Sequence, residues 1–203
     1  MPGEKAPITV RVASEDDLKQ LKQIHTVINK AYRSEGGWTT EAHLVKEERI
    51  TLQELEATLL DTVNPVLLAY DSETNLPLGT LQIETYEHYP DFGVFTGNGH
   101  TNTYVDTVPK EKQAVLGLFS VHPEQQSRGI GRKLVEAALQ HIESAMDRTH
   151  AMVYVIVQRP ELISWYTRLG FIDHGEKMQF PDASRLKDPS IHFCVLRRPL
   201  REN

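Results

Sequence analysis

A short turn rich in glycine and basic residues lies between an apolar run and an amphipathic segment. The turn is "QSRGIG", residues 126–131. Glycine allows the backbone to approach a ligand closely, and the N–H groups at the start of a helix attract anions. With Arg128, Arg132 and Lys133 close by, the sequence predicts a cradle for a diphosphate. The alternative is a tight strand–helix connection whose basic side chains are merely solvated.

The spacing of this turn excludes two common phosphate-binding motifs. A Walker loop requires a lysine directly after its second glycine and then a hydroxyl residue, whereas Gly131 is followed by Arg132, Lys133 and Leu134. A dinucleotide fingerprint requires a further glycine three positions later, where Leu134 stands. The pattern that fits is Gln/Arg-x-x-Gly-x-Gly/Ala, after an apolar run that ends in "VHP", residues 121–123.

A second motif, "WYTRLGF" at residues 165–171, has the pattern Tyr-x-x-x-Gly-Phe. In this order the two motifs resemble the GCN5-related N-acetyltransferase (GNAT) superfamily, and the order of strands and helices is similar from Ile8 onward. The resemblance implies transfer of an acetyl group from acetyl-CoA to an amine. It also implies an α/β fold with a central, mostly antiparallel sheet, flanked by helices and splayed into a V where two strands separate.

The resemblance further implies which residues bind acetyl-CoA. Backbone N–H groups of the turn and helix start would hold the pyrophosphate, and the end of the preceding strand would face the pantetheine and the thioester carbonyl. The implied residues are Phe119, Ser120, Val121, Gln126, Ser127, Arg128, Gly129, Ile130, Gly131, Arg132, Arg159 and Tyr166. At Arg159 the family often has an asparagine, although similar "RPEL" sequences occur in a subset that also has a later "GE" and "FP", as at residues 175–176 and 180–181.

Two catalytic roles need side chains. By resemblance the phenol of Tyr166 lies near the sulfur of CoA and can protonate the departing thiolate; the alternative is an aromatic ring that packs beneath "LGF". The base that takes the amine proton is an Asp, Glu or His within reach, directly or through water. Glu84, at the end of a predicted strand, is the candidate we adopt, and Glu41 and His122 are the alternatives.

The acceptor is expected to be the primary amine of a small molecule, attacked directly in a ternary complex. Trp38 and Glu41 follow the first predicted helix, where this superfamily builds its acceptor pocket. The long turn-rich insertion, residues 86–113, is expected to cover the site. Two other functions stay open: a protein or peptide acetyltransferase acting on N-termini or lysines, which needs an open groove, and a non-catalytic acyl-CoA-binding protein.

The elements that position these residues follow from periodicity and capping signals. Strands are predicted at 8–12, 66–70, 78–85, 114–121, 151–157 and 192–198, with one further strand left open between the last two. Helices are predicted from Ser14 to about Tyr32, at 51–61 with Thr51 as the cap, from Gly131 onward, and at 161–169. The result is one domain spanning residues 1–203, with a mixed α/β sheet and a core at about 8–198.

Composition argues against several classes of protein: nucleic-acid-binding, membrane-spanning and metal-binding proteins. The formal charge of −6 argues against a nucleic-acid partner, and no apolar run approaches the length of a membrane span. Scattered histidines without ligand spacing argue against a metal site. The single cysteine, Cys194, and the lack of a signal sequence favour a cytoplasmic location, with the nucleus not excluded. A homodimer, and a longer acyl donor, are left open.

Overall fold

The computed structural model describes residues 6–34, 36–86, 94–96 and 108–200. Its internal contacts divide the chain into two compact units. Unit 1 comprises Met1–Thr40, Glu48–Gln82 and Leu118–Ala138, and unit 2 comprises Glu41–Glu47, Ile83–Gly117 and Leu139–Asn203. We describe each unit by itself. The expectation of one domain over residues 1–203 stays a prediction.

Unit 1 is built on an antiparallel meander. Strand β1 (Ile8–Val12) pairs with β2 (Val66–Asp71), and β2 pairs with β3 (Pro77–Thr85), whose residues up to Gln82 belong to this unit. The turn from β2 to β3 is closed by the carboxylate of Asp71, which accepts from the backbone N–H groups of Glu73 and Thr74. These strands were predicted, with bounds that differ by one residue at most.

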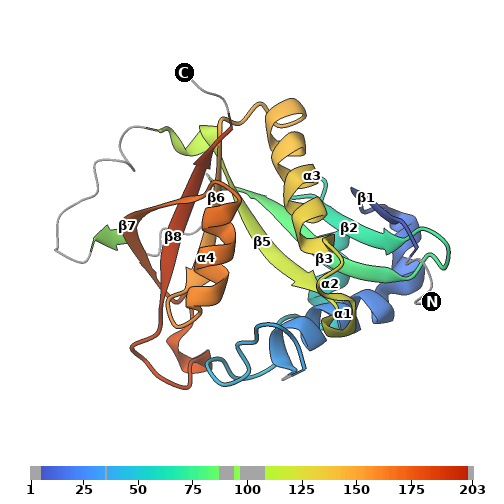
Figure 1. Ribbon diagram of the computed structural model, residues 1–203, viewed down its shortest axis with the longest axis horizontal. Helices are drawn as coiled ribbons and strands as arrows, with labels where there is room; N and C mark the ends of the chain where they lie inside the picture. The colour runs from blue at the N-terminus through green and yellow to red at the C-terminus, as the bar shows by residue number, and fades with distance from the viewer. Residues whose placement is uncertain (1–5, 35, 87–93, 97–107, 201–203) are drawn as a thin grey trace. The chain divides into compact units, whose positions relative to one another are not determined.

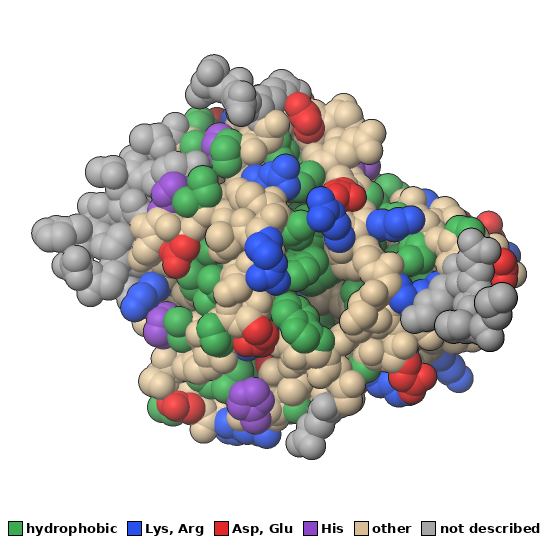
Figure 2. Space-filling view, viewed as in Figure 1, with side chains coloured by type: hydrophobic (Ala, Val, Ile, Leu, Met, Phe, Trp, Pro, Cys, Tyr) green, Lys and Arg blue, Asp and Glu red, His purple; other side chains and the backbone are tan. Residues whose placement is uncertain are grey.

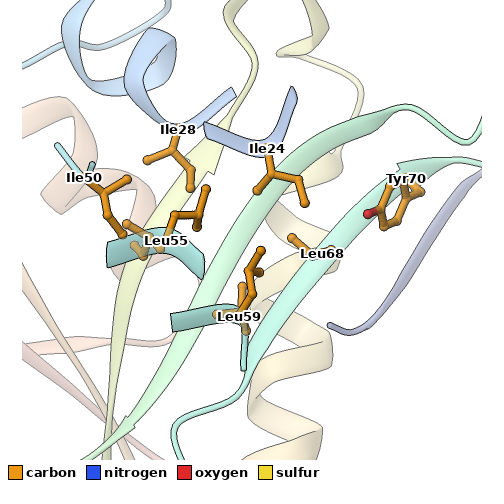
Figure 3. Close-up of a cluster of buried hydrophobic side chains, with 9 residues drawn as sticks. Ile24, Ile28, Ile50, Leu55, Leu59, Leu68 and Tyr70 are labelled. Atoms are coloured by element: carbon orange, nitrogen blue, oxygen red, sulfur yellow. The ribbon is translucent and has the colours of Figure 1, made fainter. Parts of the chain in front are cut away.

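Two helices supply the apolar side chains that cover this meander. They are α1 (Leu21–Arg33) and α2 (Leu52–Leu59), and α2 begins with the predicted capping box of Thr51 and Glu54. Ile24 and Ile28 of α1 and Leu55 of α2 are fully buried and belong to one cluster with Leu68 and Tyr70 of β2, in which Ile28 lies next to Leu55 (Figure 3). The helical spacing of apolar residues in the sequence therefore marks the buried faces of both helices.

The first predicted helix differs from expectation at its start. Residues Glu15–Gln20 form a 3-10 helix, η1, and the α-helix begins only at Leu21. Asp17 is the physical reason for the tighter turn. Its buried carboxylate accepts from the backbone N–H of Ser14 (2.8 Å), from both terminal nitrogens of Arg11 (2.7 Å each) and from the Tyr70 hydroxyl (2.6 Å). These bonds hold the first turn against β1 and β2.

Unit 2 contains most of the remaining strands. They are β4 (Val94–Thr96), the start of β5 (Gln113–Val121), β6 (His150–Ile156), β7 (Ile172–Gln179) and β8 (His192–Pro199). Strand β8 lies between β6 and β7 and is antiparallel to both, and β4 pairs with β7 (Figure 1). The open question of one or two final strands is answered by two. Helix α4 (Pro160–Arg168) joins β6 to β7.

The pairing of β5 with β6 is parallel and short. Within unit 2 it covers Gln113–Val115 against 150–152, and β6 pairs along its other side with β8. The full strand order is β1-β2-β3-β5-β6-β8-β7-β4. The expected fold class, a mixed and mostly antiparallel sheet with flanking helices, is confirmed.

A charged group lies at the centre of unit 2. Arg197 of β8 and Glu176 of β7 are fully buried and ion-paired at 2.7 Å, and the guanidinium also donates to the side chain of Gln113 on β5. Side chains from three strands thus pair with one another in a buried region, where an unpaired charge would be costly. Glu176 belongs to the "GE" motif noted in the sequence, and its partner in the fold is this arginine.

Two expectations concern the insertion and the surface. Most of the predicted insertion, 86–113, lies outside the described residues, but its central residues 94–96 form β4, which the sequence did not indicate. None of the described helices combines the length and apolarity needed to cross a bilayer. The face drawn in Figure 2 carries both basic and acidic side chains.

Candidate active site

The turn before α3 (Ile130–Ser144) has a backbone suited to binding an anion. Ser127 and Gly129 have φ of +65° and +77°, so left-handed residues alternate along the turn. Such alternation directs successive N–H groups to one side, as in an anion-binding nest. The carbonyl of Gly129 accepts the first helical bond, from Lys133 N at 3.0 Å. The N–H groups of residues 130–132 therefore have no intrahelical partner and carry the positive end of the helix dipole.

The basic side chains around this turn are engaged with other protein groups. Arg128 is largely buried, donates to Gln125 Oε1 (2.6 Å) and to the carbonyl of Ala6 (2.8 Å), and lies 3.7 Å from Asp71. Arg132 is exposed and pairs with Glu136 one turn further along α3. The expectation of a cradle thus rests on the backbone of the turn, and the Arg128 side chain fastens the turn to its surroundings.

Gln126 joins the turn to the segment after α1. Its Oε1 accepts from the backbone N–H of Trp38 at 2.6 Å, and its Nε2 donates to the carbonyl of Val121 at 3.4 Å. Gly37 lies against the same amide, where a Cβ would come within 3.2 Å of Gln126 Nε2. The Trp38 side chain is 52% exposed. A predicted coenzyme-binding residue and a predicted acceptor residue are therefore in direct contact within unit 1.

The end of β5 departs from regular strand geometry. Leu118 has φ +45°, a left-handed conformation that is rare for a residue with a bulky side chain. A left-handed residue inside a strand changes the direction of the next peptide group, as in a β-bulge. Directly after it come Phe119, Ser120 and Val121, the residues expected to face the pantetheine. Ser120 is buried, and Phe119 and Val121 are half-buried.

Glu84 approaches β5 at a glycine. A Cβ built on Gly117 would overlap the Glu84 carboxylate, so the glycine lets this carboxylate occupy its present position. Both residues belong to unit 2, and Glu84 is half-buried on β3. The carboxylate proposed as the base thus lies against the backbone of β5, one residue before the left-handed Leu118.

Helix α4 carries the candidate acid. Tyr166 is 1% exposed, and its ring makes edge-to-face contacts with Trp165 and Phe171 at centroid distances of 4.9 and 5.3 Å. The helix ends at Arg168, and Gly170, predicted to terminate it, follows with a φ of +86°, a value that favours glycine. The Phe171 N–H then bonds back to the Tyr166 carbonyl at 3.1 Å. The "YxxxGF" motif therefore fixes the ring of Tyr166 through the helix end and the following phenylalanine.

Arg159 and Glu41 are brought together, although the sequence assigned them to different ligands. Arg159 Nη1 lies 3.6 Å from Glu41 Oε1, and both side chains are about nine-tenths buried, at 11% and 8% exposure. The pair joins the start of α4 to the segment Glu41–Glu47. A bridge between Val45 and Leu186 and a bond from Lys187 Nζ to the Ala42 carbonyl (2.6 Å) hold the same segment.

Other candidates have different roles. His122 Nδ1 accepts from the backbone N–H of Glu124 at 3.3 Å, and burial lowers the pKa of the imidazole, with Lys30 adding to the effect. Burial, with Asp173 beside it, raises the pKa of the Cys194 thiol to about 12, so this buried cysteine is a thiol and not a nucleophile. Among the described residues, no group of three or more His, Cys, Asp or Glu side chains is arranged to hold a metal ion.

Two residues that contact the candidate site were not predicted from the sequence. Thr80 is fully buried on β3 and donates to the carbonyl of Leu118, and Gly117 makes room for Glu84. The available signals were a threonine inside the apolar run 78–83 and a glycine inside the apolar run 114–121. Neither signal identifies a partner, because each depends on contacts between strands distant in sequence.

Comparison with known proteins is consistent with these features. Residues 75–173 match the family model of the acetyltransferase (GNAT) domain, and this stretch contains both motifs. No functionally curated protein matches the sequence. Similar solved structures include a putative phosphinothricin N-acetyltransferase (17% identity, TM-score 0.62, 97% of this chain and 100% of that one).

Two further structures from named organisms have the same fold. An N-acetyltransferase from Staphylococcus aureus Mu50 has 13% identity and a TM-score of 0.64, over 97% of this chain and 100% of that one. Spermidine N-acetyltransferase from Vibrio cholerae, in complex with CoA and spermine, has 16% identity and a TM-score of 0.61, over 95% of each chain. At these identities the similarity shows the fold alone.

Proposed function

Because the chain carries a GNAT acetyltransferase domain and is therefore an acetyl-CoA-dependent acetyltransferase, we propose that its acceptor is the primary amine of a small molecule. The use of acetyl-CoA as the donor is supported by the left-handed, glycine-containing turn at 126–131, which lies inside the stretch that matches the family. The choice of a small-molecule acceptor is supported by proteins of the same fold. Spermidine and phosphinothricin, named for two proteins of the same fold, are both small amines.

The turn and the helix start are proposed to bind the pyrophosphate of CoA. The N–H groups of residues 130–132 have no partner among the described residues, and the nest at Ser127 and Gly129 adds further donors beside them. Such backbone donors bind a phosphate oxygen without losing side-chain entropy. The exposed Arg132 is available to exchange Glu136 for a phosphate, whereas Arg128 stays with Asp71.

The chemistry is direct acyl transfer. The amine nitrogen attacks the thioester carbon and forms the C–N bond, and the carbonyl oxygen becomes an oxyanion that backbone N–H groups at the end of β5 would stabilise. As the C–S bond breaks, the sulfur leaves as a thiolate and takes a proton from the Tyr166 hydroxyl. Glu84 takes the proton that the amine nitrogen loses. The products are the acetylated amine and free CoA.

The proposed acceptor residues have unequal support. Trp38 is exposed, with its backbone held by Gln126, and its indole is free to cover an acceptor. Glu41 is buried and paired with Arg159, so we propose that it fixes the segment Glu41–Glu47 instead of binding the acceptor amine. In this proposal Arg159 does not contact CoA, and it influences CoA binding only by fixing the start of α4.

A thiol-release assay tests the proposal. The purified chain is mixed with acetyl-CoA and a panel of spermidine, phosphinothricin, aminoglycosides, amino acids and peptides with a free N-terminus or lysine. We expect CoA release above the amine-free rate with one class of small amine. Release with peptides alone would favour the protein acetyltransferase, and acetyl-CoA binding without any release would favour an acyl-CoA-binding protein.

Gly131→Val serves as the binding control. Gly131 lies in the first turn of α3, and a branched side chain there would cover the N–H groups proposed to bind the pyrophosphate. Acetyl-CoA affinity measured by calorimetry should fall at least about 100-fold, by analogy with the loss of several hydrogen bonds to a charged group. Gly36→Ala, at a glycine with open space around it and an ordinary φ, should bind as wild type. Unchanged affinity of Gly131→Val would refute the cradle.

A further inference from the structure

The left-handed conformation of Leu118 needs support from its surroundings. A residue with a side chain is destabilised in this region, and it persists only where neighbouring groups hold it. The Leu118 side chain is 3% exposed and belongs to the apolar cluster of Ile24, Ile28 and Leu68. This packing fixes the side chain, but the rotated carbonyl also needs a hydrogen-bond donor because it is buried.

Thr80 supplies that donor. Its Oγ1 lies 2.7 Å from the carbonyl oxygen of Leu118 and 2.8 Å from Oγ of Ser120, and both hydroxyl residues are fully buried. A hydroxyl group has one proton, which Thr80 gives to the carbonyl. The Ser120 hydroxyl must therefore donate to Thr80, and the three groups form a chain from Ser120 through Thr80 to Leu118.

This series of hydrogen bonds connects the residues on both sides of Phe119. One end is the carbonyl of Leu118, and the other is the side chain of Ser120, so the peptide groups of Phe119 are fixed from two directions. Gly79 permits this approach, because a Cβ there would overlap the carbonyl oxygen of Ser120. All of these residues belong to unit 1.

We propose that Thr80 is a positioning residue for acyl transfer: its hydroxyl holds Leu118 in the left-handed conformation and thereby aims the backbone of Phe119 at the thioester carbonyl. The inference rests on the proposed function, in which the end of β5 faces the acetyl group. Thr80 touches neither substrate, and it acts through the backbone of β5. Hydrogen bonds in such a chain strengthen one another, so removal of either hydroxyl weakens the support.

The test uses three variants. Thr80→Val keeps the shape and removes the hydroxyl, Thr80→Ser keeps the hydroxyl, and Ser120→Ala keeps the bond to Leu118 but removes its reinforcement. The first measurement is the Cα and Cβ chemical shifts of Leu118, which report φ and need no substrate. They should move toward ordinary strand values in Thr80→Val, stay near wild type in Thr80→Ser, and move less in Ser120→Ala. Unmoved shifts in Thr80→Val would overturn the proposal whatever the enzyme's activity.

The second measurement is kinetic. With an amine that wild type acetylates, kcat of Thr80→Val should fall about 10- to 100-fold, less than the loss of a whole oxyanion donor. Acetyl-CoA affinity should change less than about threefold, because the turn at 126–131 is untouched, and Thr80→Ser should recover most of kcat.

Changed chemical shifts of Leu118 together with a wild-type kcat would overturn the link to catalysis. Absence of turnover in wild type refutes the proposed function instead, and the chemical shifts still decide whether Thr80 holds Leu118. If Thr80→Val does not fold, Ser120→Ala decides by the same two readouts.

Discussion

The side chain of Gln126 accepts a hydrogen bond from the backbone N–H of Trp38, 88 residues earlier in the chain, at 2.6 Å. The first residue of the proposed coenzyme turn is therefore also the anchor of the exposed tryptophan. The backbone of Gln126 is part of the turn proposed to bind CoA, while its side-chain amide holds Trp38, the residue proposed to cover the acceptor. This contact predicts that the two ligands respond differently to a change of the side chain.

Gln126→Ala should raise the acceptor KM and leave acetyl-CoA affinity nearly unchanged. Loss of a buried or half-buried bond of this kind is worth about 1 kcal/mol, which corresponds to about a fivefold change in KM. Gln126→Glu is the matched control, because it keeps the oxygen that accepts from Trp38. An equal loss of affinity for both ligands would show that the Gln126 side chain itself contacts CoA.

Gly117→Ala tests the position of Glu84. The added methyl group would overlap the Glu84 carboxylate, so the carboxylate must move. If Glu84 is the base, Glu84→Gln should lower kcat by about 10²–10³ and abolish the decline of rate at low pH, and Gly117→Ala should lower kcat by a smaller factor. The measurements are kcat against pH and acetyl-CoA affinity.

Glu41→Gln serves as the comparison, because the Glu41 carboxylate is paired with Arg159 and is proposed to fix the segment Glu41–Glu47. It should reduce thermal stability and leave the pH profile of kcat unchanged. A lost low-pH decline in Glu41→Gln, with an intact decline in Glu84→Gln, would exchange the roles of the two carboxylates.

Tyr166→Phe should lower kcat by about 10²–10⁴ while acetyl-CoA affinity changes little. The ring contacts with Trp165 and Phe171 are kept, since only the hydroxyl is removed. If the hydroxyl is the acid, the wild-type rate should also decline at alkaline pH and that decline should be absent from the variant. With chemistry rate-limiting, a kcat within about threefold of wild type would reduce Tyr166 to a packing residue.

Asp17 predicts how stability depends on pH. Burial by itself would raise the pKa of this carboxyl, but the hydrogen bonds from Arg11, Tyr70 and Ser14 outweigh burial and lower it. The folded state therefore binds the proton less readily than the unfolded chain, where the pKa is about 3.9. The stabilisation is complete above that value and is lost as the pH falls further toward the folded pKa.

Asp17→Asn should accordingly lower the free energy of unfolding at pH 7 by about 2 kcal/mol, the order of one hydrogen bond to a charged group. The difference from wild type should shrink below about pH 4 in urea titrations. Asp16→Asn is the control, because Asp16 is exposed and its pair with Lys19 is screened by water. A difference for Asp17→Asn that stays constant from pH 7 to pH 3 would contradict the assignment.

The sequence was most informative where the signal is local. The alternation at 8–12, the capping box at Thr51 and the glycine after α4 each depend on neighbours within four residues, and each predicted element was found.

The 3-10 turn at Glu15–Gln20 was not predicted, because the partner of Asp17, Tyr70, lies in a strand 53 residues away. The pairing of Arg159 with Glu41 was missed for the same reason, since 118 residues separate them. The left-handed conformation of Leu118 carries no local signal at all, because a leucine stands where glycine would be expected.

Both compact units are assembled from three separate stretches of chain, and this has a consequence for fragments of the protein. The stretch 75–173, which matches the family, lacks β1, β2 and α1 of unit 1 and β8 of unit 2. A polypeptide cut to these limits would leave Leu118 without Ile24 and Ile28, and β6 without its antiparallel neighbour. The smallest continuous piece that contains unit 1 whole is Met1–Ala138, and the smallest that contains unit 2 whole is Glu41–Asn203. Each of these pieces also contains stretches of the other unit, so truncation from the ends of the chain cannot isolate either unit.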